Sequence, residues 1–309
     1  MTTTTTPTSP AKPAGPRYWV QHATHYTYQQ LVSLSQQYLH VSPRDFAYQR
    51  TETHLIVIDP PAEDGGIGHD YFGNCTRYAT ITTPHQKLLV QAESTVVLSP
   101  RLTLAEIAGS LPWERVRDNL AAPHGPDALD AVRYMSSSPH VRCSGVLAEY
   151  AKADFRAGRP LLDAALALTQ RIFDDFEYDG SATDISTPLD EVLRLKRGVC
   201  QDFAQLMIGC MRSIGLPARY VSGYVLTHPP PGQPRMIGAD ASHAWVSVYC
   251  PQRGWVDFDP TNRSLVQAEH ITLGWGRDFS DVTPLRGVVL GGGEHDLVVN
   301  VTVTPLDAV

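Results

Sequence analysis

Cysteine is scarce in this chain, and its distribution excludes the commonest scaffolds that cysteine builds. The 309 residues contain five cysteines, at positions 75, 143, 200, 210 and 250. The number is odd and no Cys-x-x-Cys pair occurs, so we expect neither a secreted disulfide framework nor a zinc ribbon. Reduced thiols fit a cytoplasmic location best, and we expect every cysteine except Cys200 to be a core or incidental residue.

Long apolar runs and an excess of positive charge are also missing. No apolar stretch approaches the roughly 20 residues that a transmembrane helix needs. The net charge of −7 argues against a general affinity for nucleic acid or for anionic membranes. Residues 1–16 are mostly Thr, Pro, Ala and Ser with no apolar signal segment, so we expect a disordered tail. The 42% of hydrophobic residues can build a core without disulfides or a structural metal.

The pattern divides the rest of the chain into three parts of an α+β protein. Short strand-like segments over residues 17–100 predict a β-rich, antiparallel sandwich-like N-terminal domain. Residues 101–157 are predicted to form a helical connector and residues 158–309 the core, which we expect to end in a hairpin around the glycines at 291–293. These glycines precede no helix, so they do not predict a phosphate-binding loop. Six histidines of the first part lack metal-ligand spacing and are expected to be structural or exposed, at positions 22, 25, 40, 54, 69 and 85.

One helix of the core carries a cysteine at its open end. Gly198 permits a sharp turn, and the apolar stripe that starts at Cys200 predicts a buried helix over 200–214. Gly215 and Pro217 end the helix, and a strand follows over 219–225. A helix N-terminus favours negative charge, so a thiol in the first turn is a candidate nucleophile, although buried cysteines are also common as small core residues.

A hairpin further along supplies a base and a carboxylate. Strands at 243–250 and 254–260 flank a turn, and pairing Tyr249 with Trp255 fixes their register. His243, Asp257 and Asp259 then point to one face because side chains alternate along a strand. Asp259 falls about two residues (~7 Å) from His243 along the hairpin, and Asp257 about four residues (~13 Å). Asp259 is therefore expected to orient the imidazole, unless a bulge shifts the register.

Four motifs in this order resemble the bacterial transglutaminase-like superfamily, whose core is papain-like. They are Gly-Val-Cys-Gln-Asp-Phe-Ala at 198–204, Gly-Leu-Pro-Ala-Arg-Tyr-Val-Ser-Gly-Tyr at 215–224, Ser-His-Ala-Trp-Val at 242–246 and Trp-Val-Asp-Phe-Asp-Pro-Thr-Asn at 255–262. Residues 17–100 are similar to the β-rich region that accompanies this core in bacteria. The resemblance implies a transglutaminase-like catalytic core at 158–309, with Cys200 as nucleophile, His243 as base and Asp259 as orienting carboxylate.

The implied chemistry is acyl transfer from a peptide or protein amide through a thioester, with no cofactor. The oxyanion needs donors: the Cys200 backbone N–H is one candidate, and Tyr178 and Gln201 are weaker ones. Tyr178 also fits a core aromatic residue. A proline-rich loop at Thr227–Asp240 is expected at the surface near the site. The run Asp70–Asn74 is our candidate for contact between the N-terminal domain and the cleft.

Several functions remain open at this stage. For a bacterial member of this family the resemblance implies hydrolysis more often than crosslinking, which favours a cysteine protease or amidase. If a primary amine instead of water attacks the thioester, the protein would be a transglutaminase. No calcium-loop pattern is present. An inert binding module is a further alternative, as is a metal site of Cys200, His243 and Asp259, which would contain only one thiolate. The family resemblance also implies an ATP-grasp-like partner protein.

Overall fold

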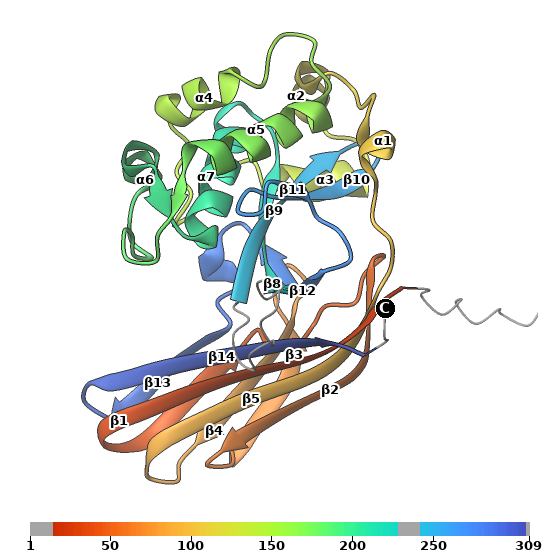
Figure 1. Ribbon diagram of the computed structural model, residues 1–309. Coiled ribbons are helices and arrows are strands. Elements are labelled where there is room, and N and C mark those ends of the chain that lie inside the picture. Colours follow the sequence, from red (N-terminus) through yellow and green to blue (C-terminus); the bar gives the residue numbers. More distant parts are fainter. Residues whose placement is uncertain (1–14, 228–241, 307–309) are drawn as a thin grey trace, which may run out of the picture.

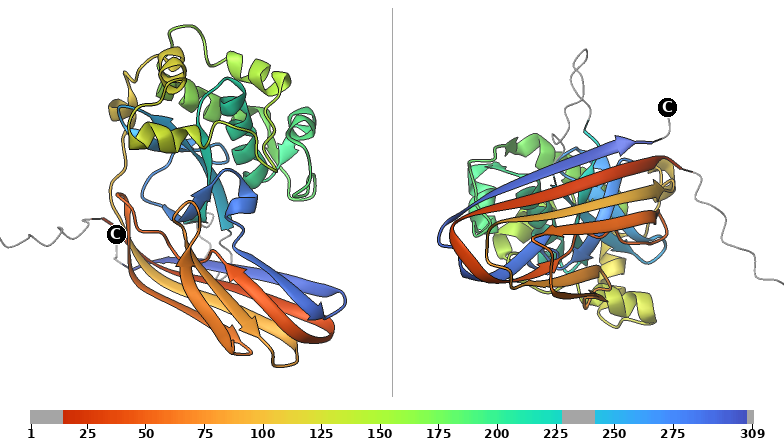
Figure 2. Two further views of the ribbon diagram at one scale, coloured as in Figure 1. Left: turned by 180° about the vertical axis from the view of Figure 1, so that it is seen from behind. Right: turned by 90° about the horizontal axis from the view of Figure 1, so that it is seen from below.

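The structure is a computed structural model that describes residues 15–227 and 242–306. A curled antiparallel sheet lies below a second part in which helices pack around a smaller sheet (Figures 1 and 2). The predicted loop at Thr227–Asp240 lies, apart from its first residue, outside the described residues, as do residues 1–14 of the predicted tail. Among the described residues, no helix combines the length and apolar character that a membrane crossing requires.

The lower part is one seven-stranded antiparallel sheet. Five strands run in the order β2-β5-β1-β4-β3, and both β13 and β14 pair with β1. The predicted two-layer, sandwich-like arrangement is therefore a single curled sheet. The strands are β1 (Arg17–Leu39), β2 (Gln49–Asp59), β3 (Asp64–His69), β4 (Cys75–Ile81), β5 (His85–Leu98), β13 (Leu285–Gly291) and β14 (His295–Pro305).

The hairpin β13–β14 belongs to this sheet, although the sequence analysis grouped it with the core at 158–309. Strand β1 has 23 residues, long enough to pair with β14 along its first half and with β13 along its second half. The chain thus enters the N-terminal sheet, builds the core and returns to the first strand. The local pattern at 285–305 predicts a hairpin correctly, but a hairpin pattern does not specify which sheet edge receives it.

The upper part is built on a five-stranded antiparallel sheet in the order β11-β10-β9-β8-β12. Helix α7 lies against β8 and β9, and one buried apolar cluster joins α4, α5, α6 and α7 to the sheet. The strands are β8 (Ala218–Val225), β9 (Ser242–Cys250), β10 (Gly254–Asp259), β11 (Ser264–Leu265) and β12 (His270–Gly276). The remaining elements are α1 (Leu104–Ile107), α2 (Trp113–Leu120), α3 (Pro126–Val132), α4 (Gly145–Lys152), α5 (Leu161–Asp175), α6 (Leu189–Leu195), α7 (Cys200–Ser213), the 3₁₀ turn η1 (Phe279–Asp281), and the short parallel pair β6 (Glu177–Tyr178) and β7 (Arg197–Gly198).

The ends of α7 follow the sequence prediction closely. The helix begins at Cys200 and ends at Ser213. The Asp202 carboxylate accepts the Val199 N–H at 2.8 Å, which satisfies one of the backbone donors at the helix start. At the other end Gly215 has φ of 80° and the Leu216 N–H returns to the Met211 carbonyl at 3.0 Å. The predicted helix and its glycine stop are confirmed.

The two parts share a buried interface. Apolar residues from both sides form one cluster, and the Arg44 guanidinium lies 3.6 Å from the centre of the Trp275 ring. The Asn74 amide donates to the Trp275 carbonyl at 2.8 Å and accepts the Trp275 N–H at 2.9 Å. The run Asp70–Asn74 therefore reaches the core through the contact of Asn74 with β12, and its predicted contact with the cleft stays a prediction.

Replacement of Asn74 by alanine should weaken this interface. It would leave the buried Trp275 N–H and carbonyl without their partners, and each unpaired buried group costs about 1–3 kcal/mol. We expect N74A to lower the free energy of unfolding by about 2–4 kcal/mol in urea denaturation. The exposed Asn300 of the same sheet provides the control, because N300A should change stability by less than about 0.5 kcal/mol. Equal effects of the two variants would contradict the role of Asn74.

Candidate active site

The hairpin β9–β10 has the register predicted from the sequence. Trp255 pairs with Tyr249 and Asp257 pairs with Ser247. His243, at the start of β9, and Asp259, at the end of β10, meet across the ribbon, and His243 Nε2 lies 2.7 Å from Asp259 Oδ2. The pairing that the sequence analysis expected for the imidazole is thus present.

Asp259 is enclosed completely, with no exposed surface. Its Oδ1 atom accepts the backbone N–H groups of Thr261 at 2.9 Å and Asn262 at 3.2 Å. Its Oδ2 atom contacts His243, the side-chain amide of Asn262 at 2.7 Å and His270 Nε2 at 2.9 Å. Burial would raise the pKa of this carboxyl, but the hydrogen bonds from the two histidines hold it well below its usual range. Asp259 is therefore a fixed negative charge.

His243 connects this carboxylate to Cys200. Burial alone would lower the imidazole pKa, yet hydrogen bonds and charge attraction from Asp259 and Cys200 raise it to about 10. Since Nε2 is engaged by Asp259, Nδ1 is the nitrogen left for the Cys200 sulfur. The ring is buried, with 9% of its surface exposed. The structure therefore brings together all three residues of the predicted constellation, with the His243 imidazole between Asp259 and Cys200.

Asp257 shares the face of Asp259 but belongs to another network. Its carboxylate forms an ion pair with Arg101 and accepts the Trp245 indole N–H at 3.3 Å. The expected distinction between the two acids is thus seen in their partners: only Asp259 bonds the histidine of the site.

Cys200 is half-buried at the N-terminal end of α7. The short parallel ladder β6–β7 pairs Tyr178 with Gly198, which places Tyr178 near the helix start. This tyrosine is 61% exposed; burial of part of its side chain raises its pKa, and the negative charges of Cys200 and Asp202 add to the effect. Gln201 is half-buried beside Cys200. The Cys200 N–H, in the first helical turn, has no partner within the helix.

Two polar residues of the site were missed by the sequence analysis. Asn262 lies within the fourth motif, and its amide bonds Asp259 and approaches His243 Nε2 at 3.4 Å. His270 opens β12 and pairs with Val225 of β8, so its position depends on a strand order that local patterns do not reveal. The only sequence signal was a histidine at the start of a β-rich segment.

The same histidines also form the one group suited to a metal ion within residues 15–227 and 242–306. Donor atoms of His243, Asp259 and His270 lie within 4.8 Å of one another. However, Nε2 of both histidines already contacts the same oxygen, Oδ2 of Asp259. The side-chain amide of Asn262 donates to this oxygen as well. A cation would have to displace these hydrogen bonds, so the donor set fits an orienting network better than a metal centre.

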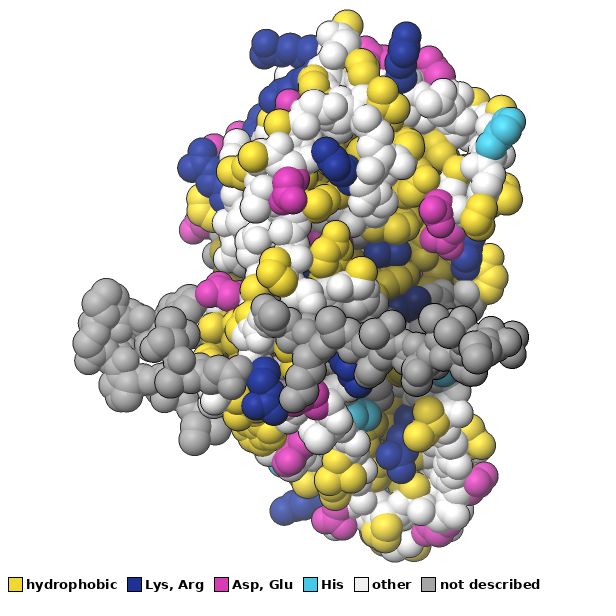
Figure 3. All heavy atoms as spheres, turned by 90° about the vertical axis from the view of Figure 1, so that its right-hand side faces the viewer, with side chains coloured by type: hydrophobic (Ala, Val, Ile, Leu, Met, Phe, Trp, Pro, Cys, Tyr) yellow, Lys and Arg dark blue, Asp and Glu magenta, His cyan; other side chains and the backbone are white. Residues whose placement is uncertain are grey.

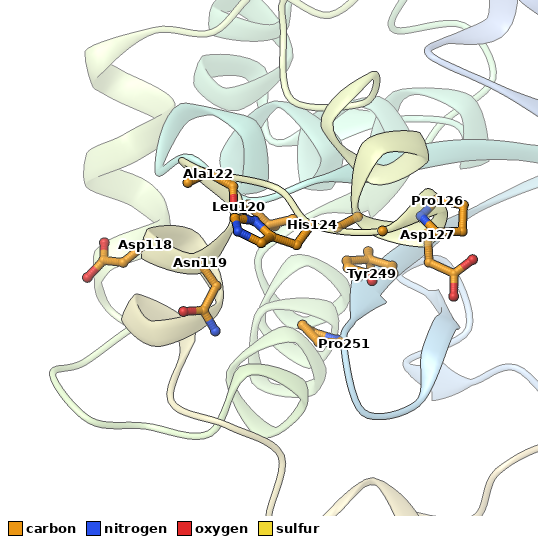
Figure 4. A pocket seen from close by; sticks show the side chains of 11 residues that line it. Asp118, Asn119, Leu120, Ala122, His124, Pro126, Asp127, Tyr249 and Pro251 are labelled. Atoms are coloured by element: carbon orange, nitrogen blue, oxygen red, sulfur yellow. Dashed lines mark hydrogen bonds between the residues drawn. The ribbon is translucent and has the colours of Figure 1, made fainter.

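Another concavity of the core lies away from this site. It has a volume of about 580 Å³ and is lined by α2, α3 and the end of β9, including Tyr249 and Pro251 (Figure 4). Tyr249 is six positions after His243 in the same strand, or about 20 Å away at ~3.3 Å per residue. On the face shown in Figure 3, acidic and basic side chains are interspersed over both parts of the molecule.

Comparisons with known proteins agree with this geometry. The model of the transglutaminase-like superfamily matches residues 149–260, and that of the bacterial transglutaminase-like N-terminal region matches residues 18–97. An uncharacterized protein of Mycobacterium tuberculosis (strain ATCC 25618 / H37Rv) is 40% identical over 94% of this chain and 93% of its own length. A protein-glutamine gamma-glutamyltransferase of Pseudomonas aeruginosa is 29% identical over 31% of this chain and 15% of its own length.

The fold also has a solved counterpart. The structure of a candidate cysteine protease from Cytophaga hutchinsonii superposes with a TM-score of 0.74 at 20% identity, covering 95% of this chain and 91% of that chain. The likeness includes both the N-terminal sheet and the core, so the α+β fold with a papain-like core is confirmed.

Removal of the Asp259 charge should be detectable at Cys200. Without that carboxylate the pKa of His243 should fall towards its ordinary value, so less imidazolium remains at pH 8 to stabilise a thiolate, which is the reactive form. We expect D259N to slow alkylation of Cys200 by iodoacetamide at about pH 8 by roughly tenfold, measured by peptide mass spectrometry. D257N removes a carboxylate from the same face without touching His243 and should leave the rate within about twofold. A similar loss in both variants would contradict the assignment.

Proposed function

We propose that this chain, which belongs to the transglutaminase-like superfamily, is a cysteine-dependent amide hydrolase. The observation that carries the proposal is the continuous set of hydrogen bonds from Asp259 through His243 to Cys200. A nucleophile, a base and an orienting group within hydrogen-bond reach are the parts that covalent amide hydrolysis needs. A candidate cysteine protease shares this fold, which supports the proposal that the fold can carry this chemistry.

The first half of the reaction forms a thioester. The Cys200 thiolate attacks the carbonyl carbon of the amide, and the negative charge moves to the carbonyl oxygen. His243 then transfers its proton to the amide nitrogen, the C–N bond breaks, and the amine leaves. Asp259 keeps the imidazole oriented and stabilises its charged form. The Cys200 backbone N–H is our first candidate to bind the oxyanion, with Tyr178 and Gln201 as further candidates at the same helix end.

The second half releases the acid. Water attacks the thioester while neutral His243 accepts one of its protons, the C–S bond breaks, and the thiolate–imidazolium pair is restored.

The five free cysteines support our proposal of a reducing, cytoplasmic location, where a thiol nucleophile stays active.

Amine transfer is the second candidate function. It is favoured by the similarity to a protein named protein-glutamine gamma-glutamyltransferase over part of the core. In that reaction a primary amine takes the place of water at the thioester. The site geometry is equally suited to both steps, because His243 can accept a proton from either nucleophile.

A peptide mixture incubated in H₂¹⁸O should test hydrolysis directly. A peptidase would introduce ¹⁸O at new C-termini, whereas a side-chain amidase would convert Gln or Asn to labelled Glu or Asp. We expect label at one of these positions with the unmodified protein and a loss of about 10³-fold or more with C200A. C210A, in a buried cysteine of the same helix, is the control and should retain activity. Label that persists in C200A would contradict the proposal.

A dansylated primary amine in the same mixture separates the two candidates. If hydrolysis is the main reaction, ¹⁸O should exceed dansyl incorporation at millimolar amine. Dansyl incorporation that replaces the ¹⁸O label would instead favour transfer.

A further inference from the structure

A pocket next to the active site has a floor supplied by the N-terminal sheet. Its volume is about 470 Å³, within the range of about 300–1,000 Å³ typical of ligand sites. Strands β1 and β14 pair so that three residues of each present their side chains to this pocket. The cross-strand pairs are His22 with Val301, Thr24 with Val299, and Tyr26 with Leu297.

The opposite wall comes from the core and lies beside the catalytic groups. Ser242 lines the pocket and is the residue directly before His243 in β9. Phe279 of η1 also lines it, and its ring lies 6.2 Å from the ring of Tyr220. Tyr220 is buried, and the charge of Cys200 contributes to the raised pKa of its hydroxyl. Ser242 is thus the chain neighbour of His243, and Phe279 contacts Tyr220 of β8, the strand that pairs with β9.

The lining is mostly apolar and carries no formal charge at neutral pH. Aliphatic side chains, Pro284 and one phenylalanine provide most of the surface. His22, the one titratable imidazole of the lining, bonds the Tyr224 hydroxyl at 2.9 Å and the Thr24 hydroxyl at 3.0 Å, and burial lowers its pKa to about 4. A charged group would thus lose its hydration in this pocket without gaining a counter-charge.

The pocket is also open. Leu297 is 52% exposed and Val299 is 45% exposed, although both lie on the face that turns towards the core. Covering these side chains would remove apolar surface from water, which is the main source of affinity for an apolar ligand group.

We propose that this pocket binds a large apolar side chain of the amide substrate, from a residue next to the scissile bond. The inference rests on the proposed function, because it places the reacting carbonyl at Cys200. In this proposal strands β1 and β14 form part of the substrate site. The substrates are peptides or proteins with a leucine-, methionine- or phenylalanine-like residue beside the cleaved amide.

Two neighbouring valines of β14 provide a matched test. Val299 faces the pocket, whereas Val298, 53% exposed, pairs with His25 and points to the other face of the sheet. V299W should fill the pocket, and V298W adds the same bulk outside it. The assay measures kcat/KM for two fluorogenic peptides that differ only in having leucine or alanine beside the scissile amide, with the sequence taken from the ¹⁸O experiment.

We expect V299W to lower kcat/KM for the leucine peptide by about tenfold or more, mainly through KM, and to change the alanine peptide by less than about threefold. V298W should match the unmodified protein for both. Thermal unfolding and the rate of Cys200 alkylation, measured for both variants, show whether the fold and the nucleophile are intact. An unchanged leucine preference in folded V299W would overturn the pocket proposal while hydrolysis by the unmodified protein stands. Absence of ¹⁸O label in the unmodified protein would instead overturn the proposed function.

Discussion

The buried Asp259 carboxylate is the constraint on which the site depends. A charge with no exposed surface is tolerated only when hydrogen bonds replace its hydration. Asp259 receives two backbone N–H groups and contacts three side-chain nitrogens. The turn after β10, the hairpin register and the start of β12 must therefore all be in place before the carboxylate can be buried. The same contacts fix His243 beside Cys200, so the site depends on the correct folding of this sheet.

The N-terminal sheet is an integral part of this arrangement and not a separate domain joined by a linker. Its first strand accepts the last two strands of the chain, and a shared apolar cluster joins its inner face to β8 and β12. His22 reaches across to Tyr224, whose strand partner is Ser242. The sheet thus holds the strand ends that carry His243 and His270. This physical continuity gives a reason why a β-rich region accompanies the core: it supports the end of the five-stranded sheet that carries His243 and supplies the floor of the pocket beside it.

The sequence predicted those features that local rules determine. A stripe of apolar residues, a terminal glycine and a turn were enough to predict α7 and the β9–β10 hairpin, and the hairpin register was enough to select Asp259 over Asp257. Features that depend on the order of strands far apart in the sequence could not be predicted from local patterns. His270 becomes a partner of Asp259 through the pairing of β12 with β8, and the last hairpin completes a sheet begun more than 250 residues earlier. Neither partner choice is encoded in the neighbouring residues.

The charge state of His243 tests the account most directly. The side-chain ¹⁵N chemical shifts of the protein can be followed by NMR from pH 5 to 10, with H243Q used to assign the signal. Because Asp259 and Cys200 raise the pKa of this imidazole to about 10, His243 should remain doubly protonated at pH 8, and in C200A it should lose its proton at a lower pH. A neutral His243 at pH 8, titrating near the ordinary value of about 6.5, would contradict the thiolate–imidazolium pair and the mechanism built on it.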